Sequence, residues 1–340
     1  MKKAFILLSF LSIMLFACTT EFDSTSGYKD ITIVYGLLDQ SDSVTFLKIN
    51  KAFLGDGDVM LMAKEEDSSS YGNALDVKIH YKKGNFLDSV TFDTTTIYNK
   101  DSGVFYAPKQ VLYKANMKTI LNQYKTDTFK LVITNKKTGK TIHSKTILES
   151  SFEITKPKPP SIGFTSAVPG SIVWKSSVNG KKHQVLMRFH YKEVKPGTTD
   201  TVYHSIDWQF PTTSSVGNIG GEVMTQQYTN AYFFDLLAQK IPVDASLKRY
   251  IGQKGHSTAD YGALELFVYV ASDEFSTYLD VAAPSTSLVQ EKPDYTNVTN
   301  ASGAITQDAT GIFSSRYHEL RSFKLNDLTQ AQIKSMNLGF

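Results

Sequence analysis

Cysteine is almost absent from this sequence: its 340 residues contain only one, Cys18. A single cysteine excludes a disulfide within the chain, so stability has to come from burial of apolar side chains. It also excludes a zinc site built from several cysteine thiolates. Hydrophobic residues make up 41% of the chain, and its length is sufficient for two domains with separate cores.

A large excess of charge of either sign is also lacking. The chain has 36 Lys and Arg residues and 33 Asp and Glu residues, a formal net charge of +3. Two of the positive charges, Lys2 and Lys3, lie in the first residues of the chain. Nucleic acids are held by concentrated positive charge, so the sequence predicts no nucleic-acid partner.

Motifs of known catalytic and cofactor sites are missing. The sequence has no Gly-x-Ser-x-Gly nucleophile elbow, and the glycines of residues 217–221 lack the strand-to-helix spacing of a nucleotide-binding loop. Ser257 lies close to His256 and Asp260, but adjacency in sequence does not define a catalytic triad. The sequence therefore predicts no enzyme activity and no cofactor.

Metal ligands are equally sparse. The closely spaced carboxylates of residues 55–58 (GDGD) have the chemistry that calcium prefers, but the closing Glu of a calcium-binding loop is absent. His183 and His190 are an odd number of positions apart on one predicted strand, so they should point to opposite faces. The sequence predicts no metal site.

The apolar run of residues 4–17 is too short to span a membrane, which takes roughly 20 residues. It follows two lysines and ends at Cys18, a layout typical of a secretory signal. Residues 15–18 (LFAC) resemble a bacterial lipobox, in which the chain is cut before the cysteine and the cysteine carries lipids. This resemblance implies a signal peptide over residues 1–17, lipidation of Cys18 and a lipid-anchored location at the outer membrane.

The polar residues 18–27 suit a flexible tether. Glu21 and Asp23 resemble the acidic signals that send lipoproteins of Bacteroidota to the cell surface, and the choice between surface and periplasmic face stays open. Five Asp-Ser/Thr triplets resemble O-glycosylation sites of exported proteins in the same phylum, although Asp and Ser also occur at ordinary turns before strands. The candidate acceptors are Ser24, Ser43, Ser89, Thr94 and Thr201.

Beyond residue 30, short segments rich in β-branched and aromatic residues predict strands separated by turns. They are residues 31–35, 44–49, 77–81, 90–92, 129–134, 140–148, 171–176, 184–191, 202–210 and 264–271. Apolar spacing and capping residues predict short helices over residues 117–124, 228–241 and 326–335, with Asn326 capping the last. Residues 55–73 are predicted to be a loop, and Asn179-Gly180 a hairpin turn.

Three prolines within residues 156–160 predict a domain boundary. The expected fold is mainly β, with two β-sandwich domains over residues 28–155 and 156–283. The proline-rich entry and the aromatic residues that follow, among them Trp174, resemble an immunoglobulin-like or fibronectin type III sandwich. Residues 284–340 are expected to form an irregular strap with a short helix.

Two late segments have the most distinctive sequences in the chain: residues 288–298 (LVQEKPDYTNV) and residues 311–316 (GIFSSR). With the lipobox and the β-rich front half, they resemble uncharacterised outer-membrane lipoproteins of Bacteroidota with a domain of unknown function. The resemblance implies an envelope location and association with outer-membrane nutrient-uptake transporters, and it brings no active site. A physical interpretation of the second segment is that Ile312 and Phe313 bury against the second domain while Arg316 pairs with a carboxylate.

The predicted function is a lipid-anchored envelope protein with a binding or scaffolding role, accessory to nutrient uptake. One alternative is a surface hydrolase acting on glycan or peptide through the loops at residues 55–73 or 252–262. Another is a structural or adhesin component that presents aromatic side chains to a partner. The aromatic cluster Tyr228, Tyr232, Phe233 and Phe234 could serve that role, but Phe233 is predicted to be core.

Overall fold

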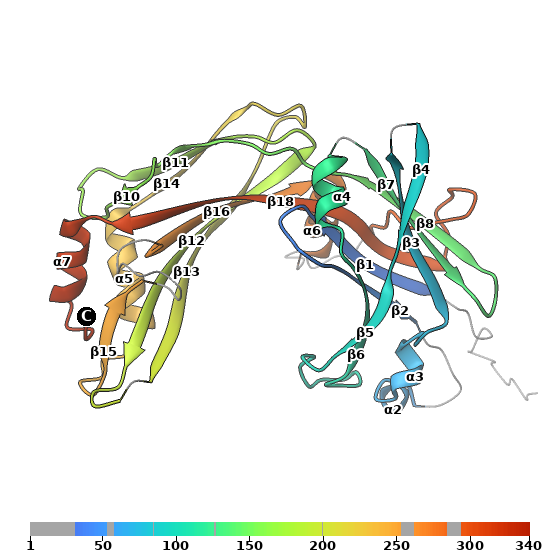
Figure 1. The fold of residues 1–340 in the computed structure, drawn as a ribbon, viewed down its shortest axis with the longest axis horizontal. Coiled ribbons are helices and arrows are strands. Elements are labelled where there is room, and N and C mark those ends of the chain that lie inside the picture. Colours follow the sequence, from blue (N-terminus) through green and yellow to red (C-terminus); the bar gives the residue numbers. More distant parts are fainter. Residues whose placement is uncertain are drawn as a thin grey trace, which may run out of the picture.

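The computed structural model describes residues 31–52, 58–83, 85–125, 127–198, 200–252, 262–283 and 294–340. These residues form a mainly β structure with several sheets, as the sequence predicted. Figure 1 shows an arch with one lobe at each end.

The largest sheet has ten strands and runs through both lobes. Its main path is β13 (Thr201–Ser214), β12 (Gly180–Val194), β16 (Leu264–Ser272), β18 (Ala309–Leu325), β1 (Thr32–Asp39), β2 (Thr45–Lys51), β6 (Gln110–Ala115) and β5 (Asp93–Ile97). Two short strands attach beside this path: β10 (Ser161–Ile162) pairs with β18, and β15 (Lys248–Ile251) pairs with β12.

Strand β18 joins the two lobes. Its first half pairs in parallel with β1, from Ala309 opposite Thr32 to Arg316 opposite Asp39. Its second half pairs antiparallel with β16, from Arg316 opposite Ala271 to Phe323 opposite Leu264. The strand changes partner at Arg316, so one continuous backbone ladder connects the lobes.

The expectation of an irregular strap was therefore wrong for residues 309–325. Polar and charged side chains occupy much of this strand, which hides the apolar pattern of a central strand. Its parallel partner β1 lies far away in sequence, so no local hairpin signal marks the pairing. The short helix predicted after it is present as α7 (Asp327–Ser335), with the Asn326 side chain accepting a hydrogen bond from the Thr329 amide at 2.9 Å.

Separate layers cover the back of the large sheet in each lobe. In the N-terminal lobe the layer is a five-stranded sheet: β17 (Thr299–Asn300), β8 (Thr141–Ile147), β7 (Thr128–Asn135), β3 (Leu75–Lys83) and β4 (Phe86–Thr91). In the C-terminal lobe it consists of β14 (Val223–Tyr228), β11 (Gly170–Lys175), β9 (Ile154–Lys156), α5 (Asn230–Lys240) and α7.

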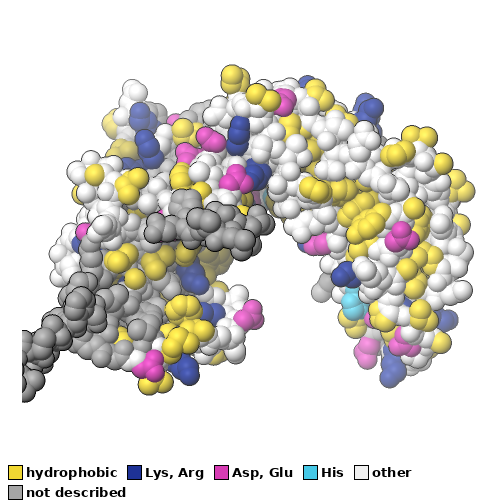
Figure 2. All heavy atoms as spheres, turned by 180° about the vertical axis from the view of Figure 1, so that it is seen from behind, with side chains coloured by type: hydrophobic (Ala, Val, Ile, Leu, Met, Phe, Trp, Pro, Cys, Tyr) yellow, Lys and Arg dark blue, Asp and Glu magenta, His cyan; other side chains and the backbone are white. Residues whose placement is uncertain are grey.

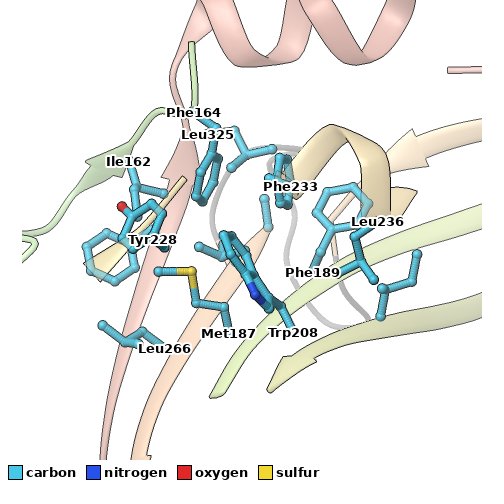
Figure 3. Close-up of a cluster of buried hydrophobic side chains, with 14 of the residues drawn as sticks. Ile162, Phe164, Met187, Phe189, Trp208, Tyr228, Phe233, Leu236, Leu266 and Leu325 are labelled. Atoms are coloured by element: carbon cyan, nitrogen blue, oxygen red, sulfur yellow. The ribbon is translucent and has the colours of Figure 1, made fainter. Parts of the chain in front are cut away.

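Each lobe has its own hydrophobic core. Figure 3 shows the C-terminal core, where Met187 and Phe189 of β12 and Trp208 of β13 face Phe233 of α5. The Phe233 ring stacks on Phe164 at 4.2 Å between centroids, which confirms its predicted core position. The two cores meet opposite halves of β18, because Phe313 belongs to the N-terminal core and Phe323 to the C-terminal one. Phe313 thus packs in the lobe opposite to the predicted one.

The other face of the large sheet, called the front face here, is largely open. Side chains alternate along strands, so the neighbours of Phe313 and Phe323 on β18 point away from the cores. Among the described residues, one helix lies against this face, α6 (Asp273–Ala282), in contact with β18, β12 and β16. Figure 2, which views the molecule from the side opposite to Figure 1, shows the hollow that the arch leaves between its lobes.

Most local predictions agree with the structure, and two differ. The predicted loop over residues 55–73 contains two single-turn helices, α2 (Val59–Met62) and α3 (Glu66–Ser69). The turn at Asn179 is present, with Asn179 at a φ of 64°, but it connects β11 to β12 in different sheets and is not a hairpin. The predicted helix near residue 120 is α4 (Lys118–Gln123).

Candidate functional site

A groove beside α6 is the main feature of the front face in the N-terminal lobe. It has a volume of about 390 Å³, and most of its wall is apolar and aromatic. The lining side chains include Tyr35, Phe46, Phe275, Tyr278, Ile312 and Arg316. Tyr35 is 43% exposed and Phe46 46% exposed, so both are accessible to a partner.

Strand alternation explains why aromatic side chains reach this groove. Val34 and Leu38 of β1 point into the N-terminal core, so Tyr35 between them points to the front. On β2, Leu47 is in the core and Phe46 is exposed. The groove therefore results from strands whose two faces both carry large apolar side chains.

Helix α6 forms the opposite wall and is held at both ends. Ser272, the last residue of β16, caps the helix by accepting a hydrogen bond from the Phe275 amide at 3.2 Å. The Ser272 hydroxyl also bonds to Ser314 of β18, and Lys182 of β12 pairs with Asp280 on the helix. These contacts fix α6 across the point where the sheet passes from one lobe to the other.

Next to the groove lies a charged cluster, at the point where β18 changes its pairing partner. It consists of Asp39, Ser41, Arg316 and His318. The Arg316 guanidinium lies 3.0 Å from Asp39, so the predicted pairing of Arg316 with a carboxylate is confirmed. Burial by itself raises the pKa of Asp39, but hydrogen bonds from His318 and Ser41 and the charge of Arg316 outweigh it and lower the pKa to about 2. Asp39 is thus a permanent anion at neutral pH.

The same cluster contains Ser41, His318 and Asp39, the residue types of a catalytic triad. A triad needs the serine on one ring nitrogen of the histidine and the carboxylate on the other. Here the Ser41 hydroxyl and the Asp39 carboxylate both face Nδ1 of His318, at 3.4 and 3.8 Å, and Ser41 donates its proton to Asp39. This geometry holds Asp39 in place and does not activate Ser41 as a nucleophile.

A second carboxyl group, Glu149, is completely buried behind the cluster. Burial raises the pKa of Glu149 to about 8; hydrogen bonds from its own backbone amide and from Ser315 oppose the shift, and the nearby charge of Asp39 adds to it. The Ser315 hydroxyl lies 3.0 Å from Glu149 Oε1, and Gln40 donates to the Glu149 carbonyl at 2.7 Å. A protonated acid and an anion therefore lie close together at the junction of the lobes.

In the C-terminal lobe the front face carries charged pairs and aromatic rings. Arg188 binds both oxygens of Asp207, at 2.6 and 2.8 Å, and its guanidinium lies 5.5 Å from the centroid of Phe267. Phe267 stacks on Tyr269 at 5.7 Å, and Tyr269 contacts the His318 ring at 5.2 Å. A band of aromatic and paired charged groups therefore extends from the charged cluster into this lobe.

A larger groove of about 630 Å³ lies at the edge of the five-stranded sheet, where β17 pairs with only two residues of β8. Basic side chains of β7 and β8 form one wall, and the segment after Asp294 forms the other. Its lining includes Lys130, His143, Lys145, Glu274, Thr299 and Ile305.

The two distinctive late segments of the sequence meet in the structure. Thr296 donates to the Gly311 carbonyl at 2.9 Å. The Asn297 amide donates to the Phe313 carbonyl at 2.7 Å and accepts from the Phe313 amide at 3.0 Å. The Thr-Asn pair thus fastens the start of β18, so the described end of the first segment, residues 294–298, and the second segment both have a structural role.

Only some of the predicted site residues lie in the described part of the chain. Cys18, Ser24 and the cluster at residues 256–260 lie outside the described residues, as do all but Asp58 of the acidic segment 55–58. The remaining glycosylation candidates, Ser43, Ser89, Thr94 and Thr201, are exposed; their modification stays a prediction.

The two candidate histidines point to opposite faces, as predicted. His183 is buried beside Trp174, and burial lowers the pKa of His183 to about 4. His190 lies on the front face, 2.8 Å from Glu265. In the described part of the chain, no three His, Cys, Asp or Glu side chains are placed to share a metal ion.

Sequence reasoning missed both grooves, because each combines residues from distant elements. No protein-family model and no curated protein matches this chain. Within the described residues, no helix combines the length and the apolar character needed to cross a membrane.

Proposed function

We propose that this protein is a lipid-anchored component of the bacterial cell envelope that binds or scaffolds a protein partner on the front face of its large sheet. The observation that carries the proposal is the groove beside α6, where exposed aromatic side chains lie next to a fixed charged cluster. Buried aromatic and arginine side chains supply much of the binding energy of protein interfaces, and Tyr35, Phe46 and Arg316 provide them here.

The anchor in this proposal is Cys18, through the lipobox-like residues 15–18. The partner is an outer-membrane nutrient-uptake transporter, in keeping with the resemblance to lipoproteins of Bacteroidota. We also propose that each lobe is an immunoglobulin-like sandwich. The separate core in each lobe supports two sandwiches, while the shared strand β18 makes them one continuous sheet.

Metabolic labelling with palmitate tests the anchor. The wild-type protein should take up label, and a Cys18→Ala variant should not. Two results would contradict lipidation at this residue: label retained by the Cys18→Ala variant, and a variant that stays in the membrane fraction.

Site-specific photo-crosslinking in intact cells tests the binding face. A crosslinker in place of Phe46 should trap an integral outer-membrane transporter. A crosslinker in place of Leu87, which is 70% exposed on β4 of the back layer, is the matched control and should not. Identical products from both positions, or no transporter from Phe46, would contradict the proposed face.

A further inference from the structure

A row of basic side chains crosses the outer surface of the five-stranded sheet. His80 of β3 is opposite Lys130 of β7, and Lys130 is opposite Lys145 of β8. His143 precedes Lys145 by two positions on β8 and so shares its face. Their neighbours Ile79, Leu131 and Ser144 are buried beneath.

The fold itself gains nothing from this arrangement. Like charges directly opposite on neighbouring strands destabilise a sheet. Lys78 on the same surface has a carboxylate partner, Asp76, at 2.7 Å, whereas among the described residues Lys130 and Lys145 have no recorded ion pair. Burial lowers the pKa of His143, and the charges of Lys130 and His80 lower it further, so these groups lie close enough to repel each other.

The row ends in the larger groove, which has the chemistry of a site for an acidic sugar. Lys130, His143 and Lys145 give the basic wall. The opposite side contributes Thr299 and Ser302, which carry hydroxyl groups, and the Ile305 side chain, which is 71% exposed. A sugar acid combines an anionic group, hydroxyl groups and an apolar ring face, and each has a counterpart here.

The spacing of the row favours a chain of such sugars over a single anion. Neighbouring strands lie about 4.8 Å apart, so Lys130 and Lys145 offer two positive charges one strand spacing apart, and the His80 side chain continues the same line. A polysaccharide with an anionic group on each sugar carries charges in a comparable linear series. The largely open groove at the end of the row has room for a sugar unit.

We propose that the row of His80, Lys130 and Lys145 and the adjoining groove bind an acidic polysaccharide. The anionic groups pair with the two lysines, and one sugar ring occupies the groove between His143 and Ile305. Glu274 also lines the groove, and its negative charge repels a second anionic group from the part of the groove next to it. The site lies on the back layer and in the groove at its edge, where α6 contributes Glu274, and the proposal does not depend on a partner at the front face.

Calorimetric titration of the full chain tests this proposal, with polygalacturonate and dextran sulfate as carboxylated and sulfated probes and dextran as the neutral one. Binding of either acidic probe, without dextran binding, is expected, and the two probes distinguish carboxylate from sulfate. A Lys130→Gln, Lys145→Gln double variant should lose at least about tenfold in affinity, and binding should weaken as salt screens the charges.

The matched controls are a Lys82→Gln, Lys78→Gln double variant, which removes two charges from the same sheet surface outside the groove, and Ile305→Ser, which leaves every charge in place. The first should change affinity less than threefold, and the second should weaken binding without changing its salt dependence. Equal losses from both double variants would overturn the proposal in favour of unspecific attraction. No binding of either acidic probe, or binding only to vesicles of anionic lipid, would overturn it as well. Unchanged melting temperatures of the variants keep folding separate from binding.

Discussion

At the scale of single residues, the most unusual groups are the buried ionisable side chains. Asp39 and Glu149 are both almost inaccessible, yet their pKa values move in opposite directions. Asp39 has a guanidinium and hydrogen-bond donors around it, whereas Glu149 has its own backbone amide and the Ser315 hydroxyl as donors, no cation, and neighbouring carboxylates. The surroundings of each carboxyl group decide which protonation state the fold stabilises.

Glu149 should make stability fall as pH rises. Its pKa is 4.5 in ordinary surroundings and about 8 in the fold, so between these pH values the folded protein holds a proton that the unfolded chain has lost. The contribution of Glu149 to the free energy of unfolding should therefore decrease from about pH 4.5 to pH 8 and change no further above it. His183, whose pKa is lowered to about 4, contributes in the opposite direction up to about pH 6.5, so the effect of Glu149 is measured as a difference from a variant. In a Glu149→Gln variant, urea unfolding should show a smaller decrease over this range. An identical pH slope in both proteins would contradict the assignment. The contribution of Asp39 is separable, because it is lost only as pH falls from 3.8 towards 2.

Arg249 should be the most costly cation to remove. Its side chain is fully buried, its Nε donates to Glu193 at 2.8 Å, and its Nη1 donates to the Leu338 carbonyl at 2.6 Å. Removing one partner of a buried pair typically costs about 3–5 kcal/mol, so Arg249→Ala should lower the free energy of unfolding by that amount. Arg321→Ala is the control, since Arg321 is partly exposed and 3.8 Å from Glu319, and should cost less than about 1 kcal/mol. Equal losses in chemical denaturation would show that the Glu193 pair is not stabilising.

At the scale of elements, β18 is the strand on which the fold depends most. It pairs with two strands that belong to different lobes, and it supplies buried residues to both cores. Gly311 near its start has a φ of 114° and lies against the backbone of Val34. A β-carbon at this position would collide with the Val34 carbonyl oxygen, so only glycine allows β1 and β18 to approach here.

The substitution Gly311→Ala should therefore destabilise the protein strongly. Gly303→Ala is a matched control, because Gly303 also has a positive φ, 86°, but has open space around it. The control should cost only the backbone strain, about 1–2 kcal/mol. Thermal unfolding should show a clearly larger loss for Gly311→Ala, and equal losses would mean that the sheet relaxes around the added methyl group.

At the scale of the whole molecule, the N-terminal lobe is assembled from both ends of the chain. Arg316 and Asp39, which pair across β18 and β1, are 277 residues apart in sequence. The predicted domain over residues 28–155 lacks the strand that completes its sheet, and it also lacks Phe313 from its core. The prolines at residues 156–160 mark a bend in the chain, but the two lobes still share one sheet.

A fragment of residues 28–155 should therefore not unfold cooperatively by itself. Joining residues 294–316 to its end through a flexible linker should restore a cooperative transition, since this piece carries the first half of β18 and the Thr296 and Asn297 contacts that fasten it. Circular dichroism during heating would show the difference. A cooperative transition in the shorter fragment would contradict a requirement for β18.

Local chemistry was sufficient for much of the fold. The cap at Asn326 and the core position of Phe233 follow from side chains close in sequence, and the structure confirms both. The opposite orientations of His183 and His190 needed only the two-residue period of a strand.

The grooves could not be predicted in this way. The groove beside α6 combines Tyr35, Phe46, Phe275 and Ile312, and the larger groove combines Lys130, Lys145 and Ile305. In both cases the residues come from elements that are distant in sequence. An aromatic or basic residue on a predicted strand shows that one face is exposed, but not what lies opposite.

The sequence by itself determined the β class, most strands, the three predicted helices and the expectation of a lipid anchor at Cys18, because each depends on short-range pattern or on a contiguous motif. Only the tertiary structure decided that β18 is a central strand, that the lobes share one sheet and that a basic row leads into a groove. Strand pairing joins segments irrespective of their separation in sequence, and a sheet face acquires its chemistry from all of its strands together.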